Sequence, residues 1–373
     1  MRRVIAVGMF DSVHFGRWLD QFKDEPIEFL LFPSSPHRRL HPLLKDLTTG
    51  AFAAKFSLFM FSRFMGLPLW IVDQIAGNRV RGFLLRRAIE TFSPNYVHAL
   101  EMQNAGYIVL AALEKQKPED VKLIVTNYGS DIYWFSKFPK HRTKIVRLLS
   151  ITDYYACECQ RDVQLARELD FTGIVMPVMP NAGGFSEEVL RQPLIPGADR
   201  KILAIKGYQG WVGRAHSALA ALRLLRPLLE DFQIVVYSCN FSTVLVARRL
   251  RRETGLRITA FRKGQLSHSQ VLELFSKSAI YVGISESDGI STSLLEAMAM
   301  GAIPVQTSTA CSDEWFQNTG VTVKEIEVES ISTAITAALK MVCESSHQVV
   351  NRETVRLKAS KSTLLTTALS FYR

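Results

Sequence analysis

The stretch from Ala279 to Val305 constrains the fold more than any other part of the sequence. It starts with a short apolar run, Ala279–Gly283, which is typical of a buried strand. A loop containing Gly289 follows, and apolar residues at helical spacing then predict a helix that ends at Gly301. Ile303–Val305 begins another buried strand. A strand, a glycine-containing turn, a helix and a second strand indicate a parallel α/β unit.

The turn before this helix predicts a binding site for an anion. Backbone N–H groups at a helix N-terminus lack partners, and the positive end of the helix dipole faces the same point. Two carboxylates flank the turn, Asp288 before it and Glu296 on the helix, with seven residues between them. This combination suits a ligand that carries both a phosphate and hydroxyl groups. A structural alternative remains open, because Ser293–Glu296 also has the spacing of a helix capping box.

The segment resembles the E-x7-E signature of retaining glycosyltransferases with the GT-B fold, particularly those of family 4. The resemblance implies that Glu296 holds ribose hydroxyls and that Asp288 holds hydroxyls of the donor sugar. Asp288 stands where the family usually has Glu, so its carboxylate lies about 1.5 Å further back. Glu286 is an alternative for that contact, and Glu286–Asp288 is not a metal motif, because nothing nearby completes a coordination shell. The residues implied to face the donor phosphates are Gly289, Ile290, Ser291 and Thr292.

A chain of 373 residues is too long for one comfortable domain and predicts two. The resemblance implies an α/β protein with two Rossmann-like, doubly wound domains that face a cleft, and a last helix that crosses back to the first domain. We expect an acceptor-binding domain over residues 1–185 and a domain that binds a nucleotide sugar over residues 186–350. The returning helix is expected over residues 351–373.

Composition limits the kinds of binding partner and the cellular compartment that we expect for this protein. The net charge of +10 favours acidic partners such as an anionic lipid surface, whereas no nucleic-acid-binding motif accompanies the charge. Five cysteines show neither metal-ligand spacing nor an even disulfide set, which fits a reducing cytoplasm. No apolar run reaches the ~18 uncharged residues that a transmembrane helix needs.

The N-terminal half supplies the residues assigned to the acceptor. The run Ser12–Trp18 resembles the first loop of many family-4 enzymes, which faces the acceptor, and this implies contacts from His14 and Arg17. A satisfied loop histidine is the alternative for His14. His98 lies near the end of the predicted strand Asn95–Ala99. Asp131 lies in the loop after the predicted strand Val121–Thr126, at the sheet edge where doubly wound folds bind ligands. Asp131 has an alternative role as the cap of the next helix.

A second strand–loop–helix series begins at Lys201 and supplies further donor contacts. Three glycines punctuate the loop between Lys206 and Arg214, which predicts a phosphate-binding turn. The resemblance implies that Lys206, Gly207 and Arg214 contact the donor pyrophosphate. Further along, Arg262 and Lys263 stand where the family's loop lies against the nucleoside base.

Charge and aromatic content predict contact with an anionic membrane. The run His37–His41 is basic, and Ala51–Ile75 combines Phe, Met, Leu and Trp with Lys55 and Arg63. A helix lying on lipid is one interpretation of that stretch, and a helix packed on the N-terminal sheet is the other. A further cluster consists of Arg79, Arg81, Arg86 and Arg87.

The sequence therefore predicts a retaining glycosyltransferase that moves a sugar from a nucleotide-diphosphate sugar to a glycan or lipid-linked acceptor. We expect a role in bacterial surface polysaccharide or lipopolysaccharide assembly, in the cytoplasm or at the inner face of the plasma membrane. Cations and helix amides would carry the pyrophosphate charge, so no metal or other cofactor is expected. The alternatives are a nucleotide-sugar epimerase of the same architecture and a non-catalytic protein that binds nucleotide sugars.

Overall fold

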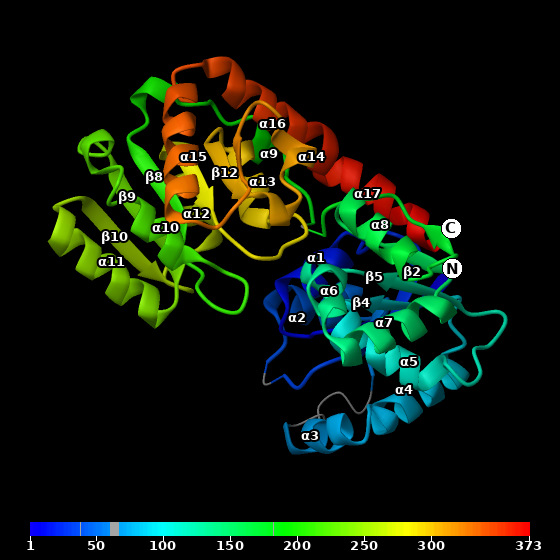
Figure 1. The fold of residues 1–373 in the computed structure, drawn as a ribbon. Helices are drawn as coiled ribbons and strands as arrows, with labels where there is room; N and C mark the ends of the chain where they lie inside the picture. The colour runs from blue at the N-terminus through cyan, green and yellow to red at the C-terminus, as the bar shows by residue number, and fades with distance from the viewer. Residues whose placement is uncertain (38, 60–66, 182) are drawn as a thin grey trace. The chain divides into compact units, whose positions relative to one another are not determined.

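The computed structural model describes residues 1–37, 39–59, 67–181 and 183–373, which form two compact units (Figure 1). Unit 1 contains residues 1–184 and 361–373, and unit 2 contains residues 185–360. The chain therefore returns at Lys361 and not at residue 351, because helix α16 (Ser345–Ala359) packs on α13 (Thr292–Ala299) within unit 2. Arg38, residues 60–66 of the aromatic stretch and Ala182 lie outside the described residues.

Unit 1 is built on a seven-stranded sheet in the order β3-β2-β1-β4-β5-β6-β7, and every pairing is parallel. Alternate residues of β1 enter different cores: Ile5 and Val7 pack in one cluster, and Val4 and Ala6 in the other. Burial on both faces explains why the strands read as continuous apolar runs. The strands are β1 (Arg2–Gly8), β2 (Ile27–Pro33), β3 (Phe56–Leu58), β4 (Tyr96–Leu100), β5 (Lys122–Thr126), β6 (Tyr154–Ala156) and β7 (Ile174–Val175).

Helices cover both faces of this sheet. Residues of α4, α5, α7 and α8 pack with Ile5 and Val7, whereas residues of α1, α2 and α17 pack with Val4 and Ala6. The helices of this unit are α1 (Val13–Asp20), α2 (Pro42–Thr48), α3 (Leu67–Ile75), α4 (Arg79–Phe92), α5 (Tyr107–Leu113), α6 (Ser130–Tyr133), α7 (Pro139–Ile151), α8 (Gln160–Glu168) and α17 (Lys361–Leu369). A π-helical turn, Met102–Gly106, leads directly into α5.

The final residues of the described chain complete the core of unit 1. Tyr372 is 2% exposed and packs against the rings of Phe22 and Phe29. Its hydroxyl accepts a hydrogen bond from Trp18 Nε1 at 3.0 Å and lies 2.7 Å from Nδ1 of His98. The returning segment is therefore an integral part of this unit.

Unit 2 has a six-stranded parallel sheet in the order β10-β9-β8-β11-β12-β13. The two sheets with helices on both faces confirm the expected pair of Rossmann-like domains. The strands are β8 (Ile202–Lys206), β9 (Gln233–Cys239), β10 (Arg257–Arg262), β11 (Ser278–Gly283), β12 (Ile303–Thr307) and β13 (Val321–Val323). The helices, besides α13 and α16, are α9 (Glu187–Leu190), α10 (Ala215–Ala221), α11 (Phe241–Thr254), α12 (His268–Lys277), α14 (Asp313–Phe316) and α15 (Val328–Met341).

The aromatic stretch does not form the single helix that the sequence predicted. Its first part contains β3, which pairs with β2, and α3 begins only at Leu67. The prediction that Arg81 contributes to a membrane-facing cluster is also wrong, because its guanidinium is fully buried and pairs with Asp73. Within the described residues, no helix is long and apolar enough to cross a bilayer.

Candidate active site

The candidate residues of unit 2 meet at the carboxyl edge of its sheet, where the strand order changes direction. Strand β8 has β9 on one side and β11 on the other, so the chain leaves these central strands toward opposite ends of the sheet. Doubly wound sheets bind ligands at such a switch point. Lys206 is the last residue of β8, and the loop carrying Asp288 and Ser291 follows β11.

Lys206 is the cation at the centre of this edge. Its Nζ donates to Ser291 Oγ at 3.0 Å and lies 3.8 Å from Asp288 Oδ2. Burial lowers the pKa of Lys206, but the Tyr281 hydroxyl and the carboxylates of Asp288 and Glu296 outweigh it, so the pKa is raised above 10.5. The ammonium group is therefore charged at neutral pH and held beside the start of α13.

The N-terminus of α13 lies beside the same cation. The helix begins at Thr292, and its N-cap residue Ser291 forms no side-chain capping bond. The Ser291 hydroxyl accepts from Lys206 instead. In the preceding loop, the Gly289 N–H donates to Asp288 Oδ1 at 3.0 Å, while Ile290 is 4% exposed and anchors the loop. A helix terminus with a neighbouring cation is suited to an anionic ligand.

Glu296 is a buried carboxylate on α13 with a histidine partner. Because the helix starts at Thr292, Glu296 is its fifth residue and the capping-box alternative is excluded. Its Oε1 lies 2.7 Å from Nε2 of His268, the first residue of α12. The sequence reasoning missed His268, because its separation of 28 residues from Glu296 gives no local pattern. The packing of α12 on α13 is what brings the two together.

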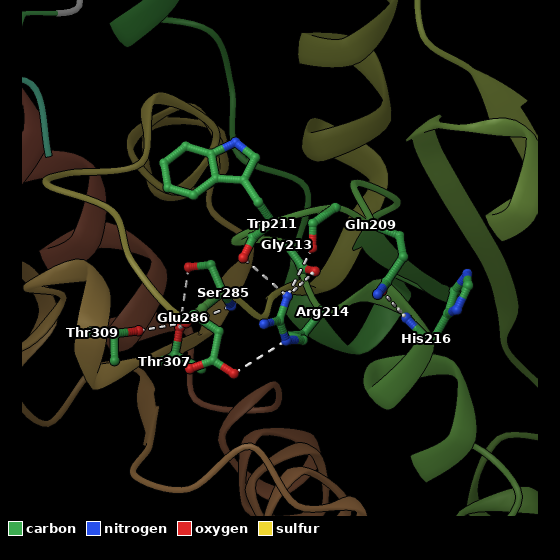
Figure 2. A network of polar contacts seen from close by, with 10 residues as sticks. Gln209, Trp211, Gly213, Arg214, His216, Ser285, Glu286, Thr307 and Thr309 are labelled. Atoms are coloured by element: carbon green, nitrogen blue, oxygen red, sulfur yellow. Dashed lines mark hydrogen bonds and ion pairs between the residues drawn. The ribbon is translucent and has the colours of Figure 1, made fainter. Parts of the chain in front are cut away.

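The side chain of Arg214 is held by hydrogen bonds to the loop that precedes it and to Glu286 (Figure 2). Its Nε donates to Glu286 Oε1 at 3.1 Å, and its Nη1 donates to the carbonyls of Gly210 and Gly213 at 2.9 and 3.0 Å. A bridge between Gly213 and Ser285 joins this loop to the one after β11. Glu286 therefore holds Arg214, which weakens its case as a substitute for Asp288.

Gly207, Arg262 and Lys263 lie at the same sheet edge. A Cβ on Gly207 would lie 2.5 Å from the Sγ of Cys239, so the position requires glycine for packing. Its N–H donates to the Tyr237 carbonyl at 2.7 Å. Arg262 ends β10 and Lys263 follows, two strands away from β8. Both side chains are exposed.

The acceptor candidates of unit 1 have separate environments. His14 and Arg17 lie one turn apart on α1, which begins at Val13, so the expected loop is shorter than predicted. The His14 ring is 6.0 Å from that of Tyr128, beyond β5. A Cβ on Gly183 would lie 2.8 Å from the Cβ of Arg17, so these segments pack closely.

His98 does not contact an acceptor, and this prediction is wrong. Its ring is fully buried, with Nδ1 2.7 Å from the Tyr372 hydroxyl and Nε2 2.6 Å from the Thr126 hydroxyl. Burial lowers the pKa of His98 to about 3, so the ring is neutral. Its neutral imidazole serves as a structural hydrogen-bonding group in the core.

Asp131 is likewise turned inward. Its Oδ2 accepts from the N–H groups of Met102 at 2.9 Å and Tyr128 at 3.0 Å, and Gly129, not Asp131, occupies the N-cap of α6. Burial, followed by the charge of Glu101, raises the pKa of Asp131 well above its ordinary value. These bonds make Asp131 a buried acceptor for backbone N–H groups, which matches neither the predicted acceptor contact nor the capping alternative.

Glu101 is a buried carboxylate to which the sequence reasoning gave no role. Its backbone has φ = +97°, and its Oε2 accepts from the Asn104 N–H at 2.9 Å at the start of the π-helical turn. Burial is the main cause that raises its pKa to about 7. The strand-end position of Glu101 was visible in the sequence, but its burial depends on helices that pack around it.

Comparison with known families concerns the unit that holds Lys206 and Glu296. Residues 186–354 match the family described as Glycosyl transferases group 1. This unit is a group 1 glycosyltransferase domain. The matched range contains all four residues predicted to be catalytic: Lys206, Arg214, Asp288 and Glu296. A search of curated proteins found no match.

Solved structures match the whole chain at low sequence identity. A glycosyltransferase from Rickettsia africae has a TM-score of 0.67 at 15% identity, covering 100% of this chain and 97% of that one. Sucrose-phosphate synthase from Thermosynechococcus elongatus gives 0.71 at 13%, with 100% and 98% covered. HepE from Anabaena, solved with UDP, gives 0.71 at 10%, with 100% and 99% covered. These likenesses confirm the GT-B fold of the glycosyltransferase, while the domain match supplies its activity class.

Proposed function

We propose that this glycosyltransferase moves a sugar, with retention of configuration, from a nucleotide-diphosphate sugar to a glycan or lipid-linked acceptor. The observation that carries the proposal is the cluster of Lys206, Ser291 and Asp288 at the start of α13, at the switch point of a group 1 domain. A charged ammonium, a helix N-terminus and carboxylates in one place suit a ligand with both phosphates and hydroxyls.

The chemistry assigns roles to these groups. When the anomeric C–O bond breaks, its electron pair stays on the departing phosphate oxygen, and negative charge develops there. Lys206 and the amides of α13 stabilise that charge because they are fixed before the reaction begins. Arg214 supplies a second cation, which Glu286 and the loop carbonyls hold in place. With these donors, the transfer needs no metal ion.

The two remaining carboxylates hold hydroxyl groups. Glu296, oriented by His268, accepts from the ribose, and Asp288 accepts from the donor sugar. Gly207, Ile290, Thr292, Arg262 and Lys263 complete the donor site as its loop and base contacts. Structures of HepE solved with UDP, and with UDP and glucose, support a nucleotide-sugar donor for a chain of this fold.

A thermal-shift screen of UDP-, GDP-, ADP- and dTDP-sugars tests the donor site, since a ligand that binds only the folded state raises Tm. We expect one nucleotide class to raise Tm in the wild type and to lose that effect in Lys206→Ala. The absence of a shift with every donor would contradict the proposal. Interconversion of the donor sugar without an acceptor would instead favour the epimerase alternative.

The membrane part of the proposal rests on the exposed face of α3 and α4. Ile75 is 84% exposed, Val72 58% and Phe83 57%, beside the exposed cations Arg79 and Arg87. Apolar side chains flanked by cations suit an anionic bilayer, with about 1 kcal/mol per cation. This would place the enzyme at the inner leaflet, where lipid-linked acceptors of surface polysaccharide or lipopolysaccharide assembly reside.

Vesicle co-sedimentation tests this surface. Wild-type protein should bind phosphatidylglycerol-containing vesicles at low salt and dissociate as salt rises, because the attraction is screened within about 10 Å at 0.1 M salt. The variant Arg79→Gln/Arg87→Gln should bind less, whereas Arg249→Gln/Arg252→Gln on α11 should bind normally. Equal binding by both variants would refute a specific role for α3 and α4.

A further inference from the structure

A second cavity, of about 320 Å³, lies within unit 1 and outside the site described above. Four elements line it: α3, the π-helical turn Met102–Gly106, the first residue of α5, and the start of α7. In Figure 1, α4, α5 and α7 lie together in this unit, and contacts join α5 to both neighbours. The lining residues are Trp70, Gln74, Gln103, Asn104, Tyr107, Lys140, His141 and Lys144.

The charge on one wall is unusual for a helix terminus. Helix α7 begins at Pro139 and has no acidic residue in its first turn, but Lys140 and His141 line the cavity there, and Lys144 lines it from the next turn. Cations at the positive end of a helix dipole are unfavourable, so this placement costs stability. Among the described residues, neither Lys140 nor Lys144 forms an ion pair. The backbone N–H groups of Lys140 and His141 also lack intrahelical acceptors. An anion bound here would satisfy all of these groups.

The other walls offer aromatic rings and neutral hydrogen-bonding groups. The Lys144 ammonium lies 4.9 Å from the centre of the Tyr107 ring, and the Tyr107 hydroxyl lies 2.9 Å from Nδ1 of His141. The indole Nε1 of Trp70 is buried, and the described residues provide it with no hydrogen-bond partner. A buried indole N–H normally finds an acceptor. Rings and amides together are suited to a sugar, whose C–H face packs on aromatic carbon while its hydroxyls pair with amides.

The position of the cavity is consistent with a substrate. Gln103 and Asn104 follow the end of β4, and α7 begins after the loop and short helices that follow β5. The cavity therefore opens near the carboxyl edge of the unit 1 sheet, which is the edge where doubly wound folds bind ligands. Gln103 Nε2 donates to the Asp131 carbonyl at 2.9 Å, which ties this wall to the buried carboxylates Glu101 and Asp131.

We infer that this cavity binds an anionic saccharide, with the phosphate or carboxylate of the sugar on Lys140, Lys144 and the α7 amides. The sugar ring then lies against Trp70 and Tyr107. The inference rests on the proposed function, since it assigns an acidic or phosphorylated sugar to the acceptor of that transferase. The same phosphate chemistry occurs in a lipid headgroup, so the experiment separates the two sources.

Isothermal titration with glucose 6-phosphate, glucose and inorganic phosphate tests the site. Wild-type protein should bind glucose 6-phosphate at least about tenfold more tightly than glucose, as expected when charged hydrogen bonds are added. Lys140→Gln/Lys144→Gln should abolish that preference. Trp70→Ala should weaken both sugars and leave phosphate binding nearly unchanged.

Two control variants define what would overturn the inference. Lys115→Gln/Lys122→Gln removes the same charge from unit 1 away from the cavity and should bind like the wild type; an equal loss there would indicate non-specific attraction. Lys206→Gln should also keep its glucose 6-phosphate affinity, and a complete loss would place the ligand in the donor site. If Lys140→Gln/Lys144→Gln lost binding to phosphatidylglycerol vesicles but kept glucose 6-phosphate affinity, the lysines would serve lipid instead.

The nucleotide-sugar thermal shift separates this inference from the proposed function. Lys140→Gln/Lys144→Gln should retain the full donor shift. A wild type without any donor shift would refute the transferase proposal, while the titrations would still report whether the cavity binds the anionic sugar.

Discussion

At the edge of the unit 2 sheet, carboxylates face side-chain cations: Asp288 lies 3.8 Å from Lys206, and Glu286 lies 3.1 Å from Arg214. At the equivalent edge of unit 1, Glu101 and Asp131 accept from backbone N–H groups instead. Burial follows the same division, because Asp288 is half-buried and Glu101 is buried.

The difference shows which edge is prepared for a charged ligand. A side-chain cation can exchange a carboxylate partner for a phosphate, so Lys206 and Arg214 can accept a donor phosphate without any change in the backbone of unit 2. Backbone donors cannot move in this way, and the burial that raises the pKa of Glu101 also removes it from solvent. In unit 1, Lys140 and Lys144, which form no ion pair within the described residues, line the cavity beside α7.

The largest expected effect comes from removing the central cation of the unit 2 edge. Lys206→Ala should lower kcat about 10²–10³-fold, because a preorganised donor to the developing charge is lost. The measurement is steady-state transfer with the donor identified by thermal shift. Lys277→Ala, at the far end of α12, is the matched control and should keep nearly full activity. Equal losses in both variants would remove Lys206 from its assigned role.

The second effect distinguishes a ligand contact from a structural one. Glu296→Ala should weaken nucleotide affinity about 5- to 150-fold, which corresponds to about 1–3 kcal/mol for a lost hydrogen-bond partner. Titration calorimetry measures the affinity, and thermal unfolding measures the fold. A lower Tm with unchanged affinity would show that Glu296 serves only the packing of α12 on α13.

The third effect concerns the stability of unit 1, which should depend on pH through His98. The folded pKa of His98 is depressed to about 3 from 6.5, so its contribution to stability is present above pH 6.5 and is lost as pH falls toward 3. At pH 5 the loss is about 2 kcal/mol, since each pH unit below 6.5 costs about 1.4 kcal/mol. Urea unfolding at pH 7 and pH 5 should show this loss in the wild type and a smaller one in His98→Gln.

The smallest expected effect is that of a metal chelator on the transfer rate, which should stay nearly unchanged. Because Lys206, Arg214 and the α13 amides carry the pyrophosphate charge, excess EDTA should change the transfer rate less than about twofold, well under the loss from one oxyanion donor. If EDTA abolished activity and Mg²⁺ or Mn²⁺ restored it, Lys206 and Arg214 would not be sufficient to stabilise the pyrophosphate charge. A metal ion would then be part of the unit 2 site.

The strands were predictable because burial on both faces leaves a continuous apolar run. β11 and β12 therefore begin within a residue of their predicted starts. β3 was missed, because Phe56–Leu58 lies in an aromatic stretch whose local pattern suits a helix, and only pairing with β2 makes it a strand.

The candidate site was predictable where one segment contains the whole pattern. Asp288, Ser291 and Glu296 belong to one loop and helix, and Lys206 ends the adjacent strand. Contacts between distant segments could not be predicted: His268 meets Glu296 only through helix packing, and His98 is buried by Tyr372, 274 residues later. The function of residues within one sequence motif can thus be predicted from the sequence. The role of an isolated polar residue depends on its burial, which the sequence does not show.

The order in which the chain is made has a consequence for unit 1. Its first 184 residues emerge early, but Trp18 and His98 acquire their shared partner only when Tyr372 has been synthesised. Unit 2 is continuous from residue 185 to 360, so all of it is synthesised before the segment that completes unit 1. The first half of the protein therefore cannot complete the aromatic pocket around Trp18 until its second half has been synthesised.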